Sequence, residues 1–258
     1  MVYMKRDLKY NSGSSRAGHE IKHSNLLAQS DPELIWNWNT PAGQLRAKRR
    51  AEKIIRGSRL GPEVFALEIG CGTGLFTEMF AQSGANLMAV DISPELLKKA
   101  RTRNLPSDRV LFVEKRFENC DIDGPFDAVI GSSVLHHLEI EIALKNIYSL
   151  LKPGGLMCFA EPNMLNPQVF VERKFRSLIP CLWYISPDET AIVRWKFRDL
   201  LLKTGFEKIK IMPFDWLHPA TPIPLIRLVG KIGKLLEVTP IFREFAGSLY
   251  IQCQRPSI

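Results

Sequence analysis

The sequence lacks the long apolar runs and the paired cysteines that define several classes of protein. None of its 258 residues lies in an uninterrupted apolar stretch of about 18 residues, the length that a membrane-spanning helix needs. The polar, basic start from Met1 to Arg16 has no apolar centre of the kind found in signal peptides. The five cysteines are scattered, odd in number and without CxxC spacing. We therefore expect a cytoplasmic protein without a disulfide framework and without a metal site.

The composition predicts one large globular domain with a basic beginning. Hydrophobic residues make up 45% and charged residues 24% of the chain, and the formal net charge is +8. Residues 1–60 hold twelve Lys and Arg against five Asp and Glu, so most of the excess positive charge lies there. Such a segment suits RNA, an anionic membrane surface or an acidic substrate, and it equally suits a solvated helix face.

From Val64 onward, short apolar runs alternate with segments of helical periodicity, which is typical of βα units around a parallel sheet. Proline and glycine in Lys152-Pro-Gly-Gly155 mark the end of one such helix. The pattern predicts helices at 75–82, 94–103, 141–151 and 189–204. It predicts seven strands, at 64–69, 86–90, 110–114, 126–130, 156–160, 208–212 and 248–252.

Two segments interrupt this alternation, and a third precedes it. Segments 163–189 and 215–247 are rich in proline and large apolar residues, so we interpret them as inserts near a pocket. Segment 34–56, with Trp36 and Trp38, is interpreted as a helical cap over the front of the sheet. The chain accordingly divides into a basic head with its cap, 1–57, and a main domain, 58–258.

The strongest local signal is Leu67-Glu-Ile-Gly-Cys-Gly-Thr-Gly74, in which a strand runs into three alternate glycines and then a helix. Glycine permits a sharp turn and removes side chains, so a ligand can lie on backbone amides near the helix N-terminus. Glu68 and the Gly-x-Gly-x-Gly spacing argue against a pyrophosphate and for a cofactor with a cationic amino group. Asp91 ends the next strand and is placed to bind both hydroxyls of a ribose.

With these motifs the sequence resembles the class I, Rossmann-like S-adenosylmethionine-dependent methyltransferases, in particular the small-molecule and ubiquinone-type group. The resemblance spans Val64 to Pro162, in the order of the family. It rests on the glycine motif together with Val90-Asp-Ile-Ser93, Phe126-Asp-Ala-Val129, Val134-Leu-His-His-Leu138 and Leu151-Lys-Pro-Gly-Gly155.

The resemblance implies an α/β fold with a mostly parallel seven-stranded sheet, whose last strand is antiparallel, and helices on both faces. It implies that S-adenosylmethionine lies across the carboxyl edge of the first strands. Glu68 would face the amino group of the cofactor, Asp91 would bind its ribose, and Ile92 would pack on adenine. The methionine half would be lined by Gly70, Cys71, Gly72, Gly74, Ser132 and Val134.

The sequence departs from the family after the third strand. Relatives often have an acidic residue there that binds the adenine amino group, and this chain has Arg116-Phe117 instead. We expect Arg116 and Phe117 to lie near adenine, with Phe117 as a stacking partner.

Four residues near the expected pocket are candidates for handling the acceptor. A neutral imidazole of His136 or His137 could take its proton, although in relatives this pair often only packs and hydrogen-bonds near the cofactor. Glu161 and Asn163, which follow the fifth strand, could orient or deprotonate the acceptor, or could only cap a turn.

The acceptor class follows from what surrounds the pocket. Gly131-Ser-Ser-Val134 stands where methyltransferases of nucleobase amino groups carry an Asn/Asp-Pro-Pro-Tyr/Phe motif, so nucleic acid is disfavoured; other RNA methylation through the basic head stays open. Residues 225–236 form a basic amphipathic pattern, which suits a lid with its apolar face on the pocket or a peripheral helix on anionic lipid; we favour the lid. A bulky, apolar small molecule is therefore expected, such as a lipid, quinone, polyketide or lipid-linked sugar.

Two further functional classes remain open. A protein of this fold could bind the cofactor without transferring its methyl group, and the undisturbed glycines cannot distinguish binding from turnover. A nicotinamide oxidoreductase is disfavoured by the glycine spacing.

Overall fold

The computed structural model describes residues 16–178, 182, 184–186 and 188–257. Residues 1–15 of the basic head lie outside the described residues, and so do five positions of segment 163–189, among them Ile179 and Trp183 of its apolar pattern.

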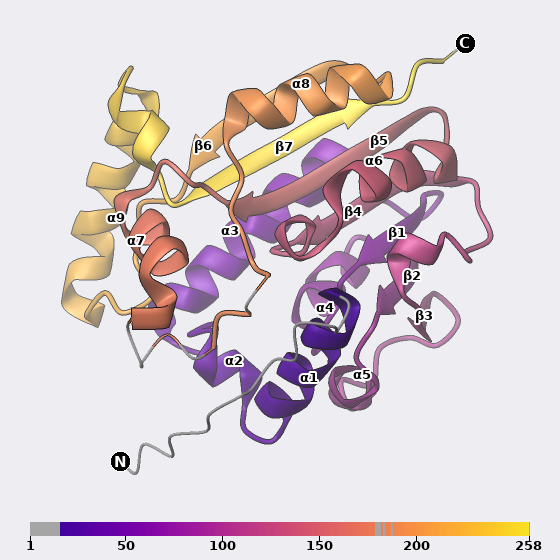
Figure 1. Ribbon diagram of the computed structural model, residues 1–258, viewed down its shortest axis with the longest axis horizontal. Coiled ribbons are helices and arrows are strands. Elements are labelled where there is room, and N and C mark those ends of the chain that lie inside the picture. The colour runs from indigo at the N-terminus through magenta and orange to yellow at the C-terminus, as the bar shows by residue number, and fades with distance from the viewer. Residues whose placement is uncertain (1–15, 179–181, 183, 187, 258) are drawn as a thin grey trace.

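One seven-stranded sheet organises the molecule (Figure 1). Its order is β3-β2-β1-β4-β5-β7-β6, and β7 alone runs antiparallel to its neighbours. The predicted Rossmann-like fold class is confirmed. The strands are β1 (Phe65–Ile69), β2 (Asn86–Asp91), β3 (Val110–Glu114), β4 (Phe126–Ser132), β5 (Leu151–Pro162), β6 (Glu207–Phe214) and β7 (Ser248–Gln254).

Helices cover both faces of the sheet. On one face α6 and α8 pack against Leu67, Val129 and Phe159; on the other α3 and α4 pack against Ala66, Ile130 and Cys158. The alternate residues of each strand thus enter two separate apolar layers. The α-helices are α1 (Arg16–Ala28), α2 (Pro32–Ile35), α3 (Pro41–Ser58), α4 (Leu75–Ala81), α5 (Pro94–Arg101), α6 (Ile140–Leu150), α7 (Pro167–Phe175), α8 (Arg194–Thr204) and α9 (Ile223–Val238).

Local signals in the sequence set several helix ends. The Thr40 hydroxyl accepts a hydrogen bond from Gly43 N at 2.9 Å at the start of α3, and Ser93 caps α5 through Leu96 N at 3.3 Å. Gly205, with φ 100°, ends α8 in the left-handed conformation. These caps fix where α3 and α5 meet the edge of the sheet.

Two predicted starts were wrong. Strand β5 begins at Leu151 instead of residue 156, because Leu151 pairs with Phe126 and the next residues lie at a register shift within the ladder. Helix α6 ends at Leu150, next to the Lys152-Pro-Gly-Gly155 motif that predicted its end. The last predicted helix begins at Arg194 instead of residue 189, because the preceding segment is extended and bridges to Asn163 through Ile192.

Helix α9 does not close over the pocket, which contradicts the preferred interpretation of residues 225–236 as a lid. None of the described residues that line the cavity comes from α9, and Leu228 and Leu235 are 55% and 65% exposed. The helix is attached instead through Gly233, which is buried against Trp216.

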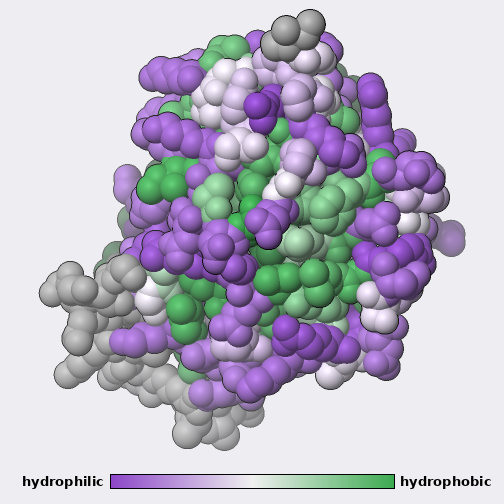
Figure 2. Space-filling view, turned by 90° about the vertical axis from the view of Figure 1, so that its right-hand side faces the viewer, coloured by the Kyte–Doolittle hydropathy of each residue, from purple (hydrophilic) through white to green (hydrophobic). Residues whose placement is uncertain are grey.

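The exposed apolar side of α9 is separate from a second apolar area of the surface. Figure 2 shows the side at the right of Figure 1, where hydrophobic side chains gather in the middle and hydrophilic ones surround them. Helix α9 lies at the opposite side, at the left of Figure 1.

Among the described helices, none is both long enough and apolar enough to cross a bilayer.

Candidate active site

The loop between β1 and α4 forms the floor of the site. Gly70, Gly72 and Gly74 have φ values of 66°, 54° and 77°, which only glycine adopts at low cost. A Cβ on Gly70 would lie 2.3 Å from the Val134 side chain, whereas one on Gly72 would meet nothing within 4 Å. The loop is therefore packed tightly at its start and open to the cavity at Gly72.

Asp91 holds this loop against the end of β2. One carboxylate oxygen accepts the Gly72 amide and the other accepts the Ser93 amide, both at 2.8 Å. Asp91 is buried yet lines the cavity together with Ile92. Burial raises the pKa of the Asp91 carboxyl, while the two amides favour its charged form.

Glu68 lies below the loop and is absent from the cavity wall. Its side chain is fully buried, and its Oε2 atom has no hydrogen-bond partner among the described residues. Burial raises the pKa of Glu68 to about 8, so the carboxyl is largely protonated at neutral pH. Gly74, the N-cap of α4, is likewise not a cavity residue.

The segment after β3 places Phe117 and Glu118 in the cavity wall but leaves Arg116 outside it. Phe117 is 3% exposed and packs into the core beside Val90. An acidic residue that the sequence analysis did not select, Glu118, thus lines the cavity directly after the Arg116-Phe117 pair. The side chains of Arg116 and Glu118 lie 3.6 Å apart.

The end of β4 brings Ser132 and Val134, which were predicted to line the methionine half of the cofactor, to the cavity wall. Ser133 has φ 58°, and its amide donates to Ala160 O at 2.8 Å, so the chain bends sharply after the strand. The Ser132 hydroxyl accepts a hydrogen bond from Arg50 at 3.3 Å.

Glu161, at the end of β5, holds the turn that carries the two histidines. Its Oε1 accepts the Val134 and Leu135 amides at 3.0 and 3.1 Å, and its Oε2 lies 2.6 Å from His136 Nδ1. Although burial opposes it, the His136 contact lowers the pKa of Glu161. Glu161 is fully buried and does not line the cavity, so its contacts position His136.

His136 and His137 both line the cavity. His137 Nδ1 lies 3.0 Å from Glu20 Oε2 of α1. Burial opposes protonation, yet Glu20 and Glu189 raise the pKa of His137 to about 9. Without a ligand His137 is therefore a cation at neutral pH and holds no lone pair for an acceptor's proton.

The Asn163 side chain forms hydrogen bonds with the loops behind the site. Its amide group donates to Glu244 O and Ala246 O at 2.8 and 2.7 Å, and its Oδ1 accepts the Leu165 amide at 3.2 Å. The side chain is buried and absent from the cavity wall, so these contacts are those of a loop anchor.

A cavity of about 560 Å³ joins these elements. Its floor is the glycine loop, and its remaining walls come largely from α1, residues 35–38, α3, residues 162–173 and residues 215–219. Only the aromatic and basic character of segment 34–56 indicates these walls in the sequence, and no pattern indicates Glu20 or Glu189. The cavity residues absent from the predicted site include Glu20, Trp36, Trp38, Arg46, Arg50, Glu189 and Trp216.

The residues around the glycine loop fit a cofactor that carries a ribose and an adenine. The open space at Gly72 leaves room for a ligand on the loop, and the Asp91 carboxylate at the cavity wall can accept further hydrogen bonds. Ile92, Leu96 and Phe117 supply apolar surface beside it. A buried Glu68 with an unpartnered oxygen lies under the loop, where a cationic group would be favoured.

Comparisons with known proteins agree with this geometry. Residues 67–157 match a family model described as a methyltransferase domain. The chain is 29% identical over 146 residues to Nodulation protein S of Rhizobium tropici, covering 55% of this chain and 59% of the relative. It is 34% identical over 135 residues to a Ubiquinone biosynthesis O-methyltransferase of Xanthomonas campestris pv. campestris, covering 50% and 56%. The chain thus spans little more than half the length of these two relatives.

Among solved structures, the fold resembles the N-methyltransferase NodS of Bradyrhizobium japonicum WM9 in complex with S-adenosyl-L-homocysteine. The TM-score is 0.62 at 16% identity, and the match covers 92% of this chain and 99% of that one. Residues 67–157 are thus similar to a methyltransferase domain, within a Rossmann-like fold that the chain shares with a solved N-methyltransferase.

Proposed function

We propose that this protein transfers a methyl group from S-adenosylmethionine to a small molecule with a large apolar part. The observation that carries the proposal is the continuity of one cavity, which runs from Asp91 and the glycine loop to a wall of tryptophan and arginine side chains. One end suits the cofactor, and the other leaves room for an acceptor beside it.

At the cofactor end we assign the ribose to Asp91 and the methionine half to Gly70, Cys71 and Gly72. Ile92 and Phe117 would pack on adenine, and Glu118 would take its amino group in place of the acid missing at Arg116-Phe117. Glu68, which is largely protonated without a ligand, would act from below the loop in its ionised form, because a cationic amino group above it favours ionisation. These assignments rest on the cavity positions of the residues and on the family resemblance.

The sulfonium group of the cofactor supplies an electrophilic methyl group, so the chain needs mainly to align the acceptor and exclude water. The buried ends of β4 and β5 and the cover formed by α1 support that role. Glu161 and Asn163, both buried away from the cavity, would act by holding loops in place. Both nitrogens of His136 already contact carboxylates, and His137 is cationic, so neither histidine is favoured as a general base in this arrangement.

At the acceptor end, the composition of the wall supports an apolar body with an acidic group. Trp36, Trp38 and Trp216 offer flat apolar surfaces. Arg50 is buried, and its described hydrogen bonds all go to neutral oxygens, those of Ser132, Ser133, Ala160 and Ser248. A buried guanidinium without a carboxylate in contact favours an anionic group on the ligand.

The first experiment is calorimetric titration of the protein with S-adenosylmethionine and S-adenosylhomocysteine, with NADH as the control. Micromolar binding of the first two alone is the expected result. An acceptor screen that compares apolar acids, their neutral analogues and hydrophilic compounds, read out as S-adenosylhomocysteine release, then tests transfer. Binding without release for any acceptor would favour a cofactor-binding protein of another function, and turnover of hydrophilic compounds alone would refute the apolar assignment.

We also propose that α9 contacts an anionic lipid surface. Its exposed leucines, Leu225, Leu228 and Leu235, accompany the exposed bases Arg227, Lys231 and Lys234, which is the composition of an interfacial helix. An apolar acceptor held in a membrane would then be near the cavity.

A further inference from the structure

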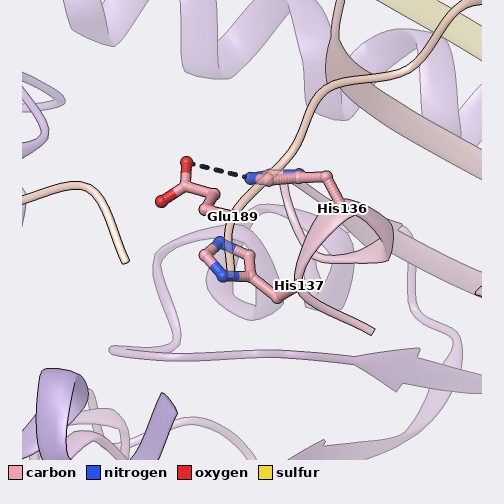
Figure 3. Close-up of side chains that lie close together, drawn as sticks. All are labelled: His136, His137 and Glu189. Atoms are coloured by element: carbon pink, nitrogen blue, oxygen red, sulfur yellow. Dashed lines mark ion pairs between the residues drawn. The ribbon is translucent and has the colours of Figure 1, made fainter. Parts of the chain in front are cut away.

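Two adjacent histidines and a glutamate from a distant part of the chain bring their side chains together at the cavity, as Figure 3 shows. The potential ligand atoms of His136, His137 and Glu189 all lie within 4.8 Å of one another. His136 Nε2 is 3.3 Å from Glu189 Oε1. Two imidazoles and one carboxylate on one side of a cavity form a donor set that divalent first-row transition metals prefer.

Each histidine is oriented by a carboxylate on its other nitrogen. His136 Nδ1 contacts Glu161 at 2.6 Å, and His137 Nδ1 contacts Glu20 at 3.0 Å. When Nδ1 of a neutral imidazole donates to a carboxylate, Nε2 carries the lone pair that binds a metal. This carboxylate–histidine arrangement is the usual support of histidine ligands in metal sites.

The charges around the cluster also favour a divalent cation. Glu20, Glu161 and Glu189 contribute three carboxylates, and Arg173, which forms an ion pair with Glu189, is the cation that faces them directly. Arg16 contacts the backbone oxygens of the two histidines, and its charge is matched by Glu139 at 3.8 Å. With both histidines neutral, as ligands must be, the cluster has an excess of two negative charges.

We propose that His136, His137 and Glu189 bind a divalent first-row transition metal such as Zn²⁺, with Glu161 and Glu20 as positioning residues for the two imidazoles. Because all three residues line the cavity, a metal held there would be accessible to an oxygen of the acceptor, whose carbonyl or hydroxyl group it would polarise; this last role rests on the proposed function. The sequence predicted no metal because two adjacent histidines and a distant glutamate have no recognisable ligand spacing.

The test uses the full-length protein, stripped with a chelator and titrated calorimetrically with ZnCl₂ in the absence of cofactor and acceptor. One Zn²⁺ per chain is expected. The isosteric change Glu189→Gln and the change His136→Gln should each remove this binding. Glu20→Gln should weaken it about 10- to 100-fold, the usual effect of losing a positioning carboxylate. His218→Gln, which alters a cavity histidine outside the cluster, is the matched control and should bind Zn²⁺ like the parent.

Substitution of Co²⁺ gives a second readout, because its visible absorption reports the ligands directly. The spectrum should change in Glu20→Gln, a variant in which all three ligands remain, and thermal melting of each variant in the chelator shows that the fold is retained. Absence of stoichiometric Zn²⁺ binding, or binding unchanged in Glu189→Gln and His136→Gln, would overturn the site. S-adenosylhomocysteine binding without Zn²⁺ binding would refute only the metal site. Zn²⁺ binding without S-adenosylhomocysteine binding would refute only the proposed function.

Discussion

At the scale of single residues, Asp91 connects the glycine loop to the end of β2 and also lines the cavity. Its carboxylate holds the Gly72 and Ser93 amides and also lines the site. Asp91→Ala should weaken S-adenosylhomocysteine binding about 10- to 100-fold, as expected for the loss of charge-assisted hydrogen bonds of about 1.5–3 kcal/mol. The protein should stay folded, because the strands around it are unchanged. Calorimetric titration and circular dichroism measure the two effects.

Glu114 provides the matched control for this change. It ends β3 directly beside Asp91 in the sheet register, but it is exposed and outside the cavity wall. Glu114→Ala should therefore bind the ligand like the parent. Equal affinities in parent and Asp91→Ala would mean that the ribose lies elsewhere.

Glu68 should make the stability of the ligand-free protein depend on pH. Burial raises its pKa from 4.5 to about 8, so between these values the folded chain keeps a proton that the unfolded chain has released. The free energy of unfolding should fall as pH rises through this window and the contribution should level off above pH about 8. Urea denaturation of the parent and of Glu68→Gln, at a series of pH values, isolates this contribution as the difference between the two curves.

The variant Glu68→Gln should gain relative stability at high pH, because its neutral amide avoids the buried charge. Parallel curves across the window would show that Glu68 is already ionised in the folded protein. His137, whose pKa is also raised, contributes in the same direction but equally to both proteins.

At the scale of elements, α9 has leucines that are exposed and contribute little to packing, so their role in membrane contact can be tested separately from their role in stability. The pair of changes Leu228→Ser and Leu235→Ser should sharply reduce cosedimentation with vesicles rich in anionic lipid, since both side chains are exposed and their loss costs the fold little. Binding of the parent to the vesicles should weaken at high salt, because salt screens the attraction between the basic residues of α9 and the anionic lipid.

A control for α9 comes from another exposed leucine. Leu111 of β3 is 56% exposed, close to the 55% of Leu228. Leu111→Ser should leave vesicle binding unchanged. Equal loss in this control, or no binding to anionic vesicles by the parent, would refute the membrane contact.

Most strands were predictable from sequence because they are short apolar runs that end at a glycine or a polar residue. Strand β5 was predicted too short, because its first residues, Leu151-Lys-Pro-Gly-Gly155, are not an apolar run and join the sheet through the pairing of Leu151 with Phe126. Where prediction failed, distant contacts outweighed local pattern. Residues 189–193 have helical periodicity, but Glu189 is held by His136 and Arg173 and Ile192 bridges to Asn163, so α8 starts later. The lid interpretation of α9 failed because amphipathicity shows which side of a helix is apolar and not what covers it.

The residues of the candidate site also divide into those that a local sequence pattern predicts and those that only distant contacts bring to the cavity. The residues of the glycine loop, Asp91 and Ser132 were predictable because they follow strands whose carboxyl ends share one edge of the sheet. Glu20, Arg50 and Glu189 reach the cavity from segments remote in sequence, and no local pattern distinguishes them from other charged residues.

At the scale of the whole molecule, cofactor binding should raise thermal stability. S-adenosylhomocysteine at 100 times its Kd should add about 2.7 kcal/mol to the free energy of unfolding, which corresponds to a Tm increase of about 5–10 °C for a chain of this size. Differential scanning fluorimetry measures this shift. NADH at the same concentration should produce no shift, and an equal shift with NADH would contradict the assigned cofactor.

The walls of the cavity have a consequence for how the molecule could be remodelled. Helix α1, Trp36, Trp38 and Arg50 all belong to the part of the chain that precedes β1, whereas the glycine loop and Asp91 follow it. The part of the proposed acceptor wall that precedes β1 is thus separate in sequence from the glycine loop and Asp91, while Trp216 and Glu189 complete the wall from later in the chain. A chimaera that exchanges residues 16–57 for those of a relative would therefore alter one side of the acceptor wall and leave the glycine loop and Asp91 unchanged.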